Sequence, residues 1–545
     1  IYDQTCATEK RRRRKRGTAV DPATRVVINP LVCEGCGDCG EQSNCLSVEP
    51  LETPFGRKRQ INQSSCNKDM SCVKGFCPSF VTVQGGQLRK KKPAQALSPF
   101  TGSPLPEPML PRIDGVWGIV VAGVGGTGVI TLGQLLGVAA HLEGRGIVTQ
   151  DAAGLAQKGG ATWSHVLLAD TQDAIRTTRV GAGAADLVLG CDPVVAAGKE
   201  TLVRMRPGRT HVALNTHTAP TAAFVHNADW QNPSDACMAE IVRATGLDGI
   251  ASFDADAAAN RLMGDSLYAN PMLLGYAWQK GWVPLRLDSL LRAIELNNMA
   301  VEANKTAFAW GRRAAVDPSS VATPPQAIQW HARESLDAML QRRAKFLTGY
   351  QNAAYAATYS AFVAQVRQVE QPLDDRLPLT EAVARYLFKL MAYKDEYEVA
   401  RLHTDPAFLA DIQAQFEGDF QLHYHLAPPL LAKKNAQGVL QKQKFGPGVR
   451  VAFQWLARLK GLRGTPFDPF GYQHERRTER ALVTEYQDSI TALLPRLTAA
   501  NHAAALAIAR IPEQIRGYGH VKARHLAAAR QQWADAVAVF DLSTK

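Results

Sequence analysis

The sequence has no long apolar run. Its apolar stretches all fall short of the roughly 20 consecutive apolar residues that a membrane-spanning helix needs, so we expect no membrane segment. No signal sequence is visible, and we therefore expect the protein in the cytoplasm, where thiols stay reduced. Apolar residues make up 46% and charged residues 21% of the 545 residues, which is ordinary for a globular protein of two to four domains.

Cysteine is scarce outside one segment near the start of the chain. Seven of the 10 cysteines lie within residues 33–77, and Cys33, Cys36 and Cys39 follow one another on a loop that contains glycine. Thiolates at this spacing converge on one iron–sulfur cube, and a remote Cys-Pro closes the fourth corner in two-cluster ferredoxins. The sequence therefore predicts a 4Fe-4S cluster held by Cys33, Cys36, Cys39 and Cys77, which precedes Pro78.

A second cluster is predicted from the other cysteines of this segment, Cys45, Cys66 and Cys72. Asp69 stands where a regular motif has its middle thiolate, with two residues between it and each of Cys66 and Cys72, and is the candidate fourth ligand. Because a carboxylate oxygen is harder than a thiolate, such a site loses iron readily and can hold a 3Fe-4S cluster. Four residues rather than three separate Cys72 from Cys77, a further departure from the ferredoxin pattern.

Two other uses of these cysteines remain open. Structural zinc takes four ligands, usually from paired Cys-x-x-Cys motifs, and disulfides need an oxidising compartment. The scattered Cys6, Cys191 and Cys237 are expected to be small buried apolar residues.

The formal charge of +12 is unevenly distributed, because residues 10–16 read Lys-Arg-Arg-Arg-Arg-Lys-Arg. Such a block can bind nucleic acid or an anionic partner, or it can form a solvated or interface segment, which is the reading we favour. A basic surface near iron–sulfur clusters would also steer an acidic electron carrier towards them.

A proline-rich linker over residues 87–112 precedes a glycine-rich turn. The apolar run that starts at Trp117 leads directly into Gly123-Val-Gly125-Gly126-Thr-Gly128 and then a helical pattern. Strand, Gly-x-Gly-x-x-Gly and helix in succession form the layout of a mononucleotide site, in which unpaired amides face a phosphate. The acidic residue that would hold a nicotinamide ribose has only Asp151 as a candidate. Three interpretations of the glycine turn stay open: it binds a nicotinamide cofactor, it binds another phosphate-bearing ligand, or it is only a tight packing turn.

Further apolar runs alternate with helical stretches up to residue 215, which predicts a doubly wound parallel sheet with helices on both faces. Ligands of such sheets bind at the carboxyl ends of the strands. We therefore expect the glycine turn to share one crevice with a second loop, which contains Lys158, Gly159 and Gly160. Residues 327–545 are rich in Ala, Leu, Gln and Arg at helical spacing and predict a helical array, in which His423 and His425 are expected to be structural.

Four ordered segments resemble the bacterial indolepyruvate:ferredoxin oxidoreductases, which belong to the thiamine-diphosphate-dependent 2-oxoacid:ferredoxin oxidoreductases. These segments are Gly75-Phe-Cys-Pro-Ser-Phe80, the glycine turn, Gln157-Lys-Gly-Gly-Ala-Thr-Trp-Ser-His165 and Asn304-Lys-Thr-Ala-Phe-Ala-Trp-Gly-Arg312. The resemblance implies a gamma-type α/β domain, which helps to bind coenzyme A in relatives that use it. It also implies that the chain is the C-terminal portion of such an enzyme, beginning with the tail of an upstream thiamine-binding domain.

The motif that holds magnesium and thiamine diphosphate in this family is missing. Gly264-Asp-Ser266, followed by Asn297, is only a chance echo of its Gly-Asp-Gly and Asn. We therefore predict no catalytic residue on this chain and expect an upstream portion or subunit to bind thiamine diphosphate and magnesium.

These observations predict a multidomain α/β protein. The expected parts are a tail with the basic run (1–24), a ferredoxin-like iron–sulfur module (25–86), the linker (87–112), the gamma-type domain (113–318) and a mainly α-helical C-terminal domain (319–545).

The resemblance implies oxidative decarboxylation of an aryl 2-oxoacid to an acyl-CoA, with ferredoxin as electron acceptor and a homo-oligomeric full enzyme. The alternative is a stand-alone iron–sulfur electron-transfer subunit with a nicotinamide-binding Rossmann-like domain.

Overall fold

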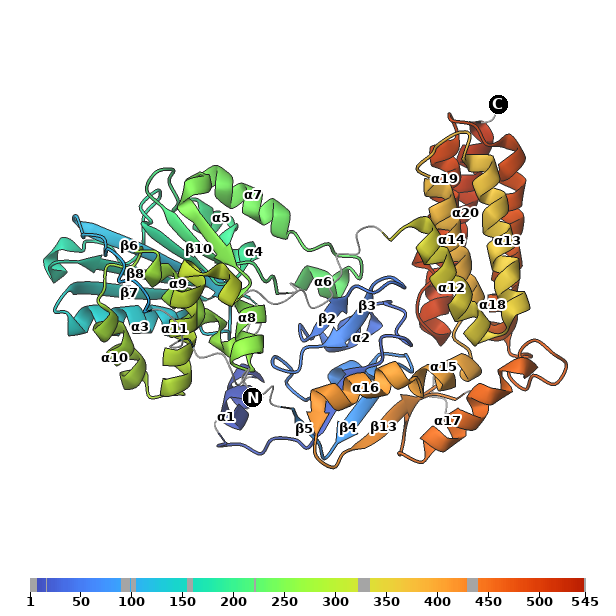
Figure 1. Ribbon diagram of the computed structural model, residues 1–545, viewed down its shortest axis with the longest axis horizontal. Coiled ribbons are helices and arrows are strands. Elements are labelled where there is room, and N and C mark those ends of the chain that lie inside the picture. The colour runs from blue at the N-terminus through green and yellow to red at the C-terminus, as the bar shows by residue number, and fades with distance from the viewer. Residues whose placement is uncertain are drawn as a thin grey trace, which may run out of the picture. The chain divides into compact units, whose positions relative to one another are not determined.

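The computed structural model describes residues 7–15, 17–89, 99, 104–153, 160–219, 222–321, 334–428 and 440–543. The chain divides into two compact units (Figure 1). The first unit comprises residues 1–21, 63–67 and 90–326, and the second comprises residues 22–62, 68–89 and 327–545. No helix within the described ranges is long and apolar enough to cross a membrane.

The first unit is built on a six-stranded sheet with the strand order β11-β10-β9-β6-β8-β7. Four of its strands are parallel, as predicted: β6 (Val116–Val124), β9 (Leu187–Gly190), β10 (His211–Asn215) and β11 (Ile250–Phe253). The prediction is wrong for β8 (Ala161–Ala169), which runs antiparallel to both β6 and β7 (Gly146–Ala153). β7 therefore points the same way as the four parallel strands but pairs with β8. Only residues 154–160 join β7 to β8, too few for the crossover of a dozen or more residues that parallel strands require.

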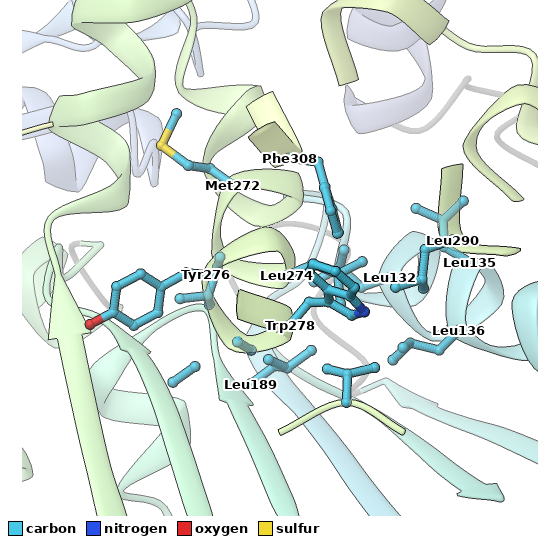
Figure 2. Close-up of a cluster of buried hydrophobic side chains, with 14 of the residues drawn as sticks. Leu132, Leu135, Leu136, Leu189, Met272, Leu274, Tyr276, Trp278, Leu290 and Phe308 are labelled. Atoms are coloured by element: carbon cyan, nitrogen blue, oxygen red, sulfur yellow. The ribbon is translucent and has the colours of Figure 1, made fainter. Parts of the chain in front are cut away.

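Helices cover both faces of this sheet, because the central strand β6 is apolar on both sides. Ile119 and Val121 face one core, and Val120 and Ala122 face the other. The first core is closed by α3 (Val129–Leu142), α9 (Ala269–Gln279), α10 (Leu287–Asn297) and α11 (Val301–Val316). In Figure 2 the leucines of α3 gather around Trp278 of α9 and Phe308 of α11. The second core lies under α4 (Pro193–Ala196), α5 (Lys199–Leu202) and α7 (Ser234–Thr245).

The second unit joins the cysteine segment to the C-terminal third of the chain. Its four-stranded antiparallel sheet has the order β1-β4-β13-β14. The strands on either side of the cysteines, β1 (Thr24–Ile28) and β4 (Phe80–Gln84), pair with each other. The next two strands, β13 (Gln421–Leu426) and β14 (Gln443–Phe445), come from the region predicted to be mainly helical. Residues 25–86 therefore share a sheet with that region rather than forming a module of their own.

Helices of the C-terminal third stand side by side in a bundle around a core of leucine, tyrosine and phenylalanine side chains (Figure 1). This bundle confirms the predicted helical array. Its members are α12 (Leu336–Tyr350), α13 (Ala353–Glu370), α14 (Pro378–Met391), α18 (His474–Leu493), α19 (His502–Arg510) and α20 (Gly519–Leu542). Shorter helices, α15 (Glu396–His403), α16 (Pro406–Gln415) and α17 (Val449–Arg458), pack near the sheet.

In the first unit α9 and α11 approach so closely that only glycine fits between them. A Cβ atom on Gly311 would lie 1.8 Å from the carbonyl oxygen of Met272. We expect Gly311→Ala to lower the free energy of unfolding by about 1–3 kcal/mol or more, because backbone must move to admit the methyl group. Urea titration followed by circular dichroism measures this change. The matched control is Gly181→Ala, where the new Cβ would meet only the Cβ of Ala184, at 3.7 Å. Equal stability of the two variants would contradict the packing argument.

Candidate cysteine and glycine-turn sites

The predicted ligands of the first cluster share one neighbourhood in the second unit. All four are free thiols, of which Cys33 and Cys39 are buried and Cys36 and Cys77 are partly exposed. Cys33 and Cys39 belong to a small core with Phe80, against which Cys77 packs. Burial raises the pKa of the Cys36 and Cys39 thiols, and the nearby Cys77 raises both further. The four thiols are therefore close enough to act on one another.

The surroundings of these thiols suit an iron–sulfur cluster. The backbone N–H of Gly35 donates to Cys33 Sγ at 3.3 Å, and Ser79 Oγ lies 2.9 Å from Cys77 Sγ. Hydrogen bonds to sulfur of this kind are a feature of protein-bound clusters and adjust their potential. Within the described ranges, no three or more His, Cys, Asp or Glu side chains have the arrangement of a bound metal ion. The case for a cluster therefore rests on the four thiols as ligands and on the groups that donate hydrogen bonds to their sulfur atoms.

Glycine shapes the cysteine loop at two places. Gly35 has φ +67°, and a Cβ there would lie 2.4 Å from the carbonyl oxygen of Arg57. A Cβ on Gly75 would lie 2.8 Å from the Cα of Cys39. The segment before Cys77 therefore touches the backbone of Cys39, which brings the remote cysteine to the three-cysteine loop.

The C-terminal region holds the carbonyl groups beside the cysteines. Tyr518 donates its hydroxyl to Val32 O at 2.6 Å, and Lys442 Nζ donates to Val73 O at 2.9 Å and to Gly75 O at 2.7 Å. His403, which is fully buried, bonds through Nε2 to Pro78 O at 2.8 Å. Each of these carbonyls belongs to a residue one or two positions from a predicted ligand.

Positive charge surrounds the cysteines. Burial lowers the pKa of Lys442, and its electrostatic interaction with the thiols of Cys77 and Cys39 opposes that effect. Arg59, which is 2% exposed, interacts in the same way with Cys39 and Cys33. Cations so placed stabilise the negative charge that thiolates and a reduced cluster carry.

Glu34, the residue after Cys33, is itself surrounded by lysines. It forms an ion pair with Lys394 at 2.6 Å. Burial raises the pKa of Glu34, but Lys394, Lys58 and Lys522 outweigh it and hold the pKa below its usual value. The three-cysteine loop is therefore tied to α20 and to the start of α15 by charge as well as by hydrogen bonds.

The ligand set predicted for the second cluster is not assembled within one unit. Cys66 belongs to the first unit with residues 63–67, whereas Cys45 and Cys72 belong to the second. Asp69 is exposed, and its Oδ1 accepts hydrogen bonds from Ser71 N at 3.0 Å and Ser71 Oγ at 2.7 Å. The structure thus gives Asp69 the role of capping the turn before Cys72, which the spacing argument did not anticipate.

The predicted glycine turn follows β6 directly. Gly126 and Gly128 have φ +87° and +105°, a conformation that other residues rarely adopt. Gly125 N donates to Gly160 O at 2.7 Å, so Gly160 meets the turn as expected. Lys158 and Gly159 lie outside the described residues. A Cβ on Gly123 would lie 2.8 Å from the Cβ of Cys191.

Part of the basic run is used inside the first unit. It lies on α1 (Ala7–Lys15), from which Arg11 donates to Ser65 O at 3.1 Å and to Gly126 O at 3.3 Å. Arg14 donates to Asn67 O. Arg11 and Arg14 of this run therefore make contacts within the first unit, and Arg11 brings a guanidinium group to the glycine turn.

The sequence analysis missed a buried polar cluster at the carboxyl ends of β9, β10 and β11. Asp192 accepts hydrogen bonds from the amides of Val194, Val195 and Ala219. Asn215 donates to Asp256 Oδ2 at 2.7 Å. Burial raises the pKa of both carboxyl groups. The signal was available, because each residue ends or closely follows an apolar run of the parallel sheet.

Residues 118–314 match the family model described as Pyruvate ferredoxin/flavodoxin oxidoreductase. Residues 336–535 match a model described as Family of unknown function (DUF6537). Residues 118–314 are therefore similar to the gamma-type portion of 2-oxoacid:ferredoxin oxidoreductases.

Two curated relatives carry the same subunit name. The protein named indolepyruvate oxidoreductase subunit IorB from Methanothermobacter thermautotrophicus is 28% identical over 203 residues, covering 37% of this chain and 98% of the relative. The subunit of the same name from Archaeoglobus fulgidus is 26% identical over 207 residues, covering 37% of this chain and 98% of the relative. A solved structure, pyruvate oxidoreductase subunit PORC from Thermotoga maritima, is 19% identical, covers 36% of this chain and 96% of its own, and has a TM-score of 0.27.

The buried His403 predicts a dependence of stability on pH. Burial lowers its folded-state pKa from 6.5 to about 4. Between these values the unfolded chain binds a proton that the folded chain does not, so the free energy of unfolding should fall as pH decreases from 6.5 to 4, by about 3 kcal/mol in total. Urea titrations across this range measure the slope.

In His403→Gln, whose amide can still donate to Pro78 O, the decline should be smaller. The control is His520→Gln, at an exposed position, which should keep the wild-type slope. An unchanged slope in His403→Gln would show that this histidine is not responsible.

Proposed function

We propose that this chain is the electron-transfer and gamma-domain portion of an oxidoreductase that decarboxylates an aryl 2-oxoacid such as indolepyruvate. An upstream portion or subunit would carry thiamine diphosphate and magnesium and perform the decarboxylation. The acyl group would pass to coenzyme A and the electrons to ferredoxin, and the full enzyme would be a homo-oligomer. The names of the gamma-domain relatives support this reading over a nicotinamide-binding subunit.

One observation carries the electron-transfer part of the proposal. Four free thiols share a buried neighbourhood with an N–H donor to sulfur and a half-buried lysine beside them. A bound 4Fe-4S cluster supplies one-electron steps, which a ferredoxin can accept. Cys33, Cys36, Cys39 and Cys77 would hold the cluster, while Gly35 N–H and the Ser79 hydroxyl would donate to its thiolates.

The glycine turn supports a role in binding the phosphate groups of coenzyme A. Gly126 and Gly128 remove side chains from the mouth of the turn, and α3 begins immediately after it. The first amides of a helix attract a phosphate, and the guanidinium of Arg11 adds positive charge beside Gly126. The predicted Lys158, Gly159 and Gly160 would complete this site. Asp192 and Asn215 would keep the adjoining loops in place.

Iron and sulfide counting on anaerobically purified protein tests the clusters directly. We expect at least four irons per chain and a signal in electron paramagnetic resonance after dithionite reduction, and we expect Cys77→Ser to lose most of the iron of the first cluster. Seven or eight irons would support a second cluster on Cys45, Cys66 and Cys72, with Asp69→Cys changing its spectrum if Asp69 is a ligand. A colourless protein that contains zinc or no metal would contradict the proposal.

The charge of Lys442 should raise the reduction potential of the first cluster. Because reduction adds negative charge beside this ammonium group, Lys442→Met should lower the ratio of reduced to oxidised cluster about tenfold at a fixed potential, which is about 59 mV for one electron. A redox titration monitored by paramagnetic resonance measures the midpoint. The control Lys442→Arg keeps the charge and should stay near the wild-type potential. An equal midpoint in Lys442→Met and wild type, at equal iron content, would contradict the argument.

A further inference from the structure

A cavity of about 720 Å³ opens beside the cysteine loops of the second unit. One side of it is formed by Val73 and Phe76, the sequence neighbours of Cys72 and Cys77. Another side comes from β13, from residues 440–444 and from the start of α20. The cavity therefore lies against the residues that adjoin the predicted cluster ligands, although nothing in the proposed reaction uses it.

Lysine dominates the charge of this cavity. Lys74, Lys442 and Lys444 line it, against Asp38 as the one carboxylate among the lining residues that the structure describes. Asp38 Oδ2 already accepts the Phe76 N–H at 2.5 Å. Lys442 donates to two backbone carbonyls, and Lys444 donates to the amide oxygen of Gln84 at 3.3 Å. Because these acceptors are uncharged, the bonds do not neutralise the charge of either lysine. The cavity therefore presents a net positive surface.

A histidine on the same surface reports this positive potential. Burial, followed by the charges of Lys442 and Lys444, lowers the pKa of His425 to about 4. Its Nε2 lies 3.1 Å from Thr82 Oγ1. His425 is therefore neutral near pH 7 and does not carry the charge of the cavity, which comes from the lysines alone.

The rim of the cavity is accessible, and its floor is partly apolar. Lys74 and Lys444 are exposed at the rim, as is His520, whose ring packs against Phe76 with centroids 4.8 Å apart. Met70 and Val73 add apolar surface between them. An apolar centre within a charged, accessible rim is typical of protein–protein interfaces, and charge of one sign on the rim speeds association with a partner of opposite sign.

We propose that this cavity docks a small acidic electron-carrier protein, which takes electrons from the cluster held by Cys33, Cys36, Cys39 and Cys77. The inference rests on the proposed function and locates its electron exit. A cluster held by these cysteines would supply one electron in each encounter, the oxidised carrier would gain it, and no bond would form or break. Lys74 and Lys444 steer the acidic face of the carrier, and Phe76 lies at the contact next to Cys77.

The test uses the full chain and does not need the upstream portion. The protein is reduced with dithionite, freed of excess reductant and mixed anaerobically in a stopped-flow instrument with an oxidised, acidic bacterial two-cluster ferredoxin. At about 50 mM salt the double charge reversal Lys74→Glu/Lys444→Glu should lower the second-order rate constant at least tenfold, and the dependence on salt should flatten. The neutral pair Lys74→Gln/Lys444→Gln should show an intermediate decrease.

Two controls separate docking from other effects. Lys345→Glu makes one of the same charge changes at an exposed position on α12 and should leave the rate constant within twofold of wild type. Electron transfer to methyl viologen, a small cation that needs no acidic docking face, should not slow in the double variants.

Each outcome decides between the two proposals. A wild-type rate constant in the neutral or the reversed pair would overturn the docking site, as would an equal loss in Lys345→Glu. If wild-type protein contains iron and reduces methyl viologen but the lysine variants still react normally with ferredoxin, only the docking inference fails. If wild-type protein contains no iron, the proposed function itself fails.

Discussion

Hydrogen bonds from the C-terminal region to the carbonyl groups beside the cysteines are the interactions on which the candidate electron-transfer site depends. A carbonyl left without a donor in a buried position costs about 1–3 kcal/mol, so a loop with several such carbonyls needs partners to stay folded. Tyr518, Lys442 and His403 are those partners, and each comes from a different part of the C-terminal region. The cysteine loops are thus shaped by residues more than 300 positions away.

The same region contributes to the electrostatic environment of the loops. Burying thiols raises their pKa, which opposes the thiolate form that iron needs. Lys442 and Arg59 oppose that cost from two sides, and the lysines around Glu34 add to the positive potential. The segment that matches a family of unknown function therefore takes part in the same site as the cysteines.

The sequence predicted best what depends on neighbouring residues. The run of glycines after Trp117 predicted a strand, a tight turn and a helix, all of which the structure contains. The ligand set predicted from the cysteine spacing, Cys33, Cys36, Cys39 and Cys77, stays a prediction. The sequence predicted less well what depends on pairing between distant segments. Nothing local in Gln421–Leu426 indicates that it completes the sheet of the cysteine segment, because strand partners are chosen by packing across the fold.

Spacing also does not show which nearer partner a side chain has. Asp69 stands at a ligand position of the ferredoxin pattern, yet Ser71, two residues away, offers its carboxylate two hydrogen bonds at once. The sequence analysis also missed the antiparallel direction of β8, because the apolar composition of a strand suits either direction. Only the short loop before β8 determines that it runs antiparallel to β7.

The pairing of β4 with β13 has a consequence for how the protein is made. Thr82 and His425, which meet across these strands, are 343 residues apart, so a ribosome working at about 5–20 residues per second needs roughly 20–70 s between them. Until then β1 and β4 form only a two-stranded ribbon, which has little stability in water. The strand that completes the sheet of the cysteine segment therefore becomes available only long after that segment has been made.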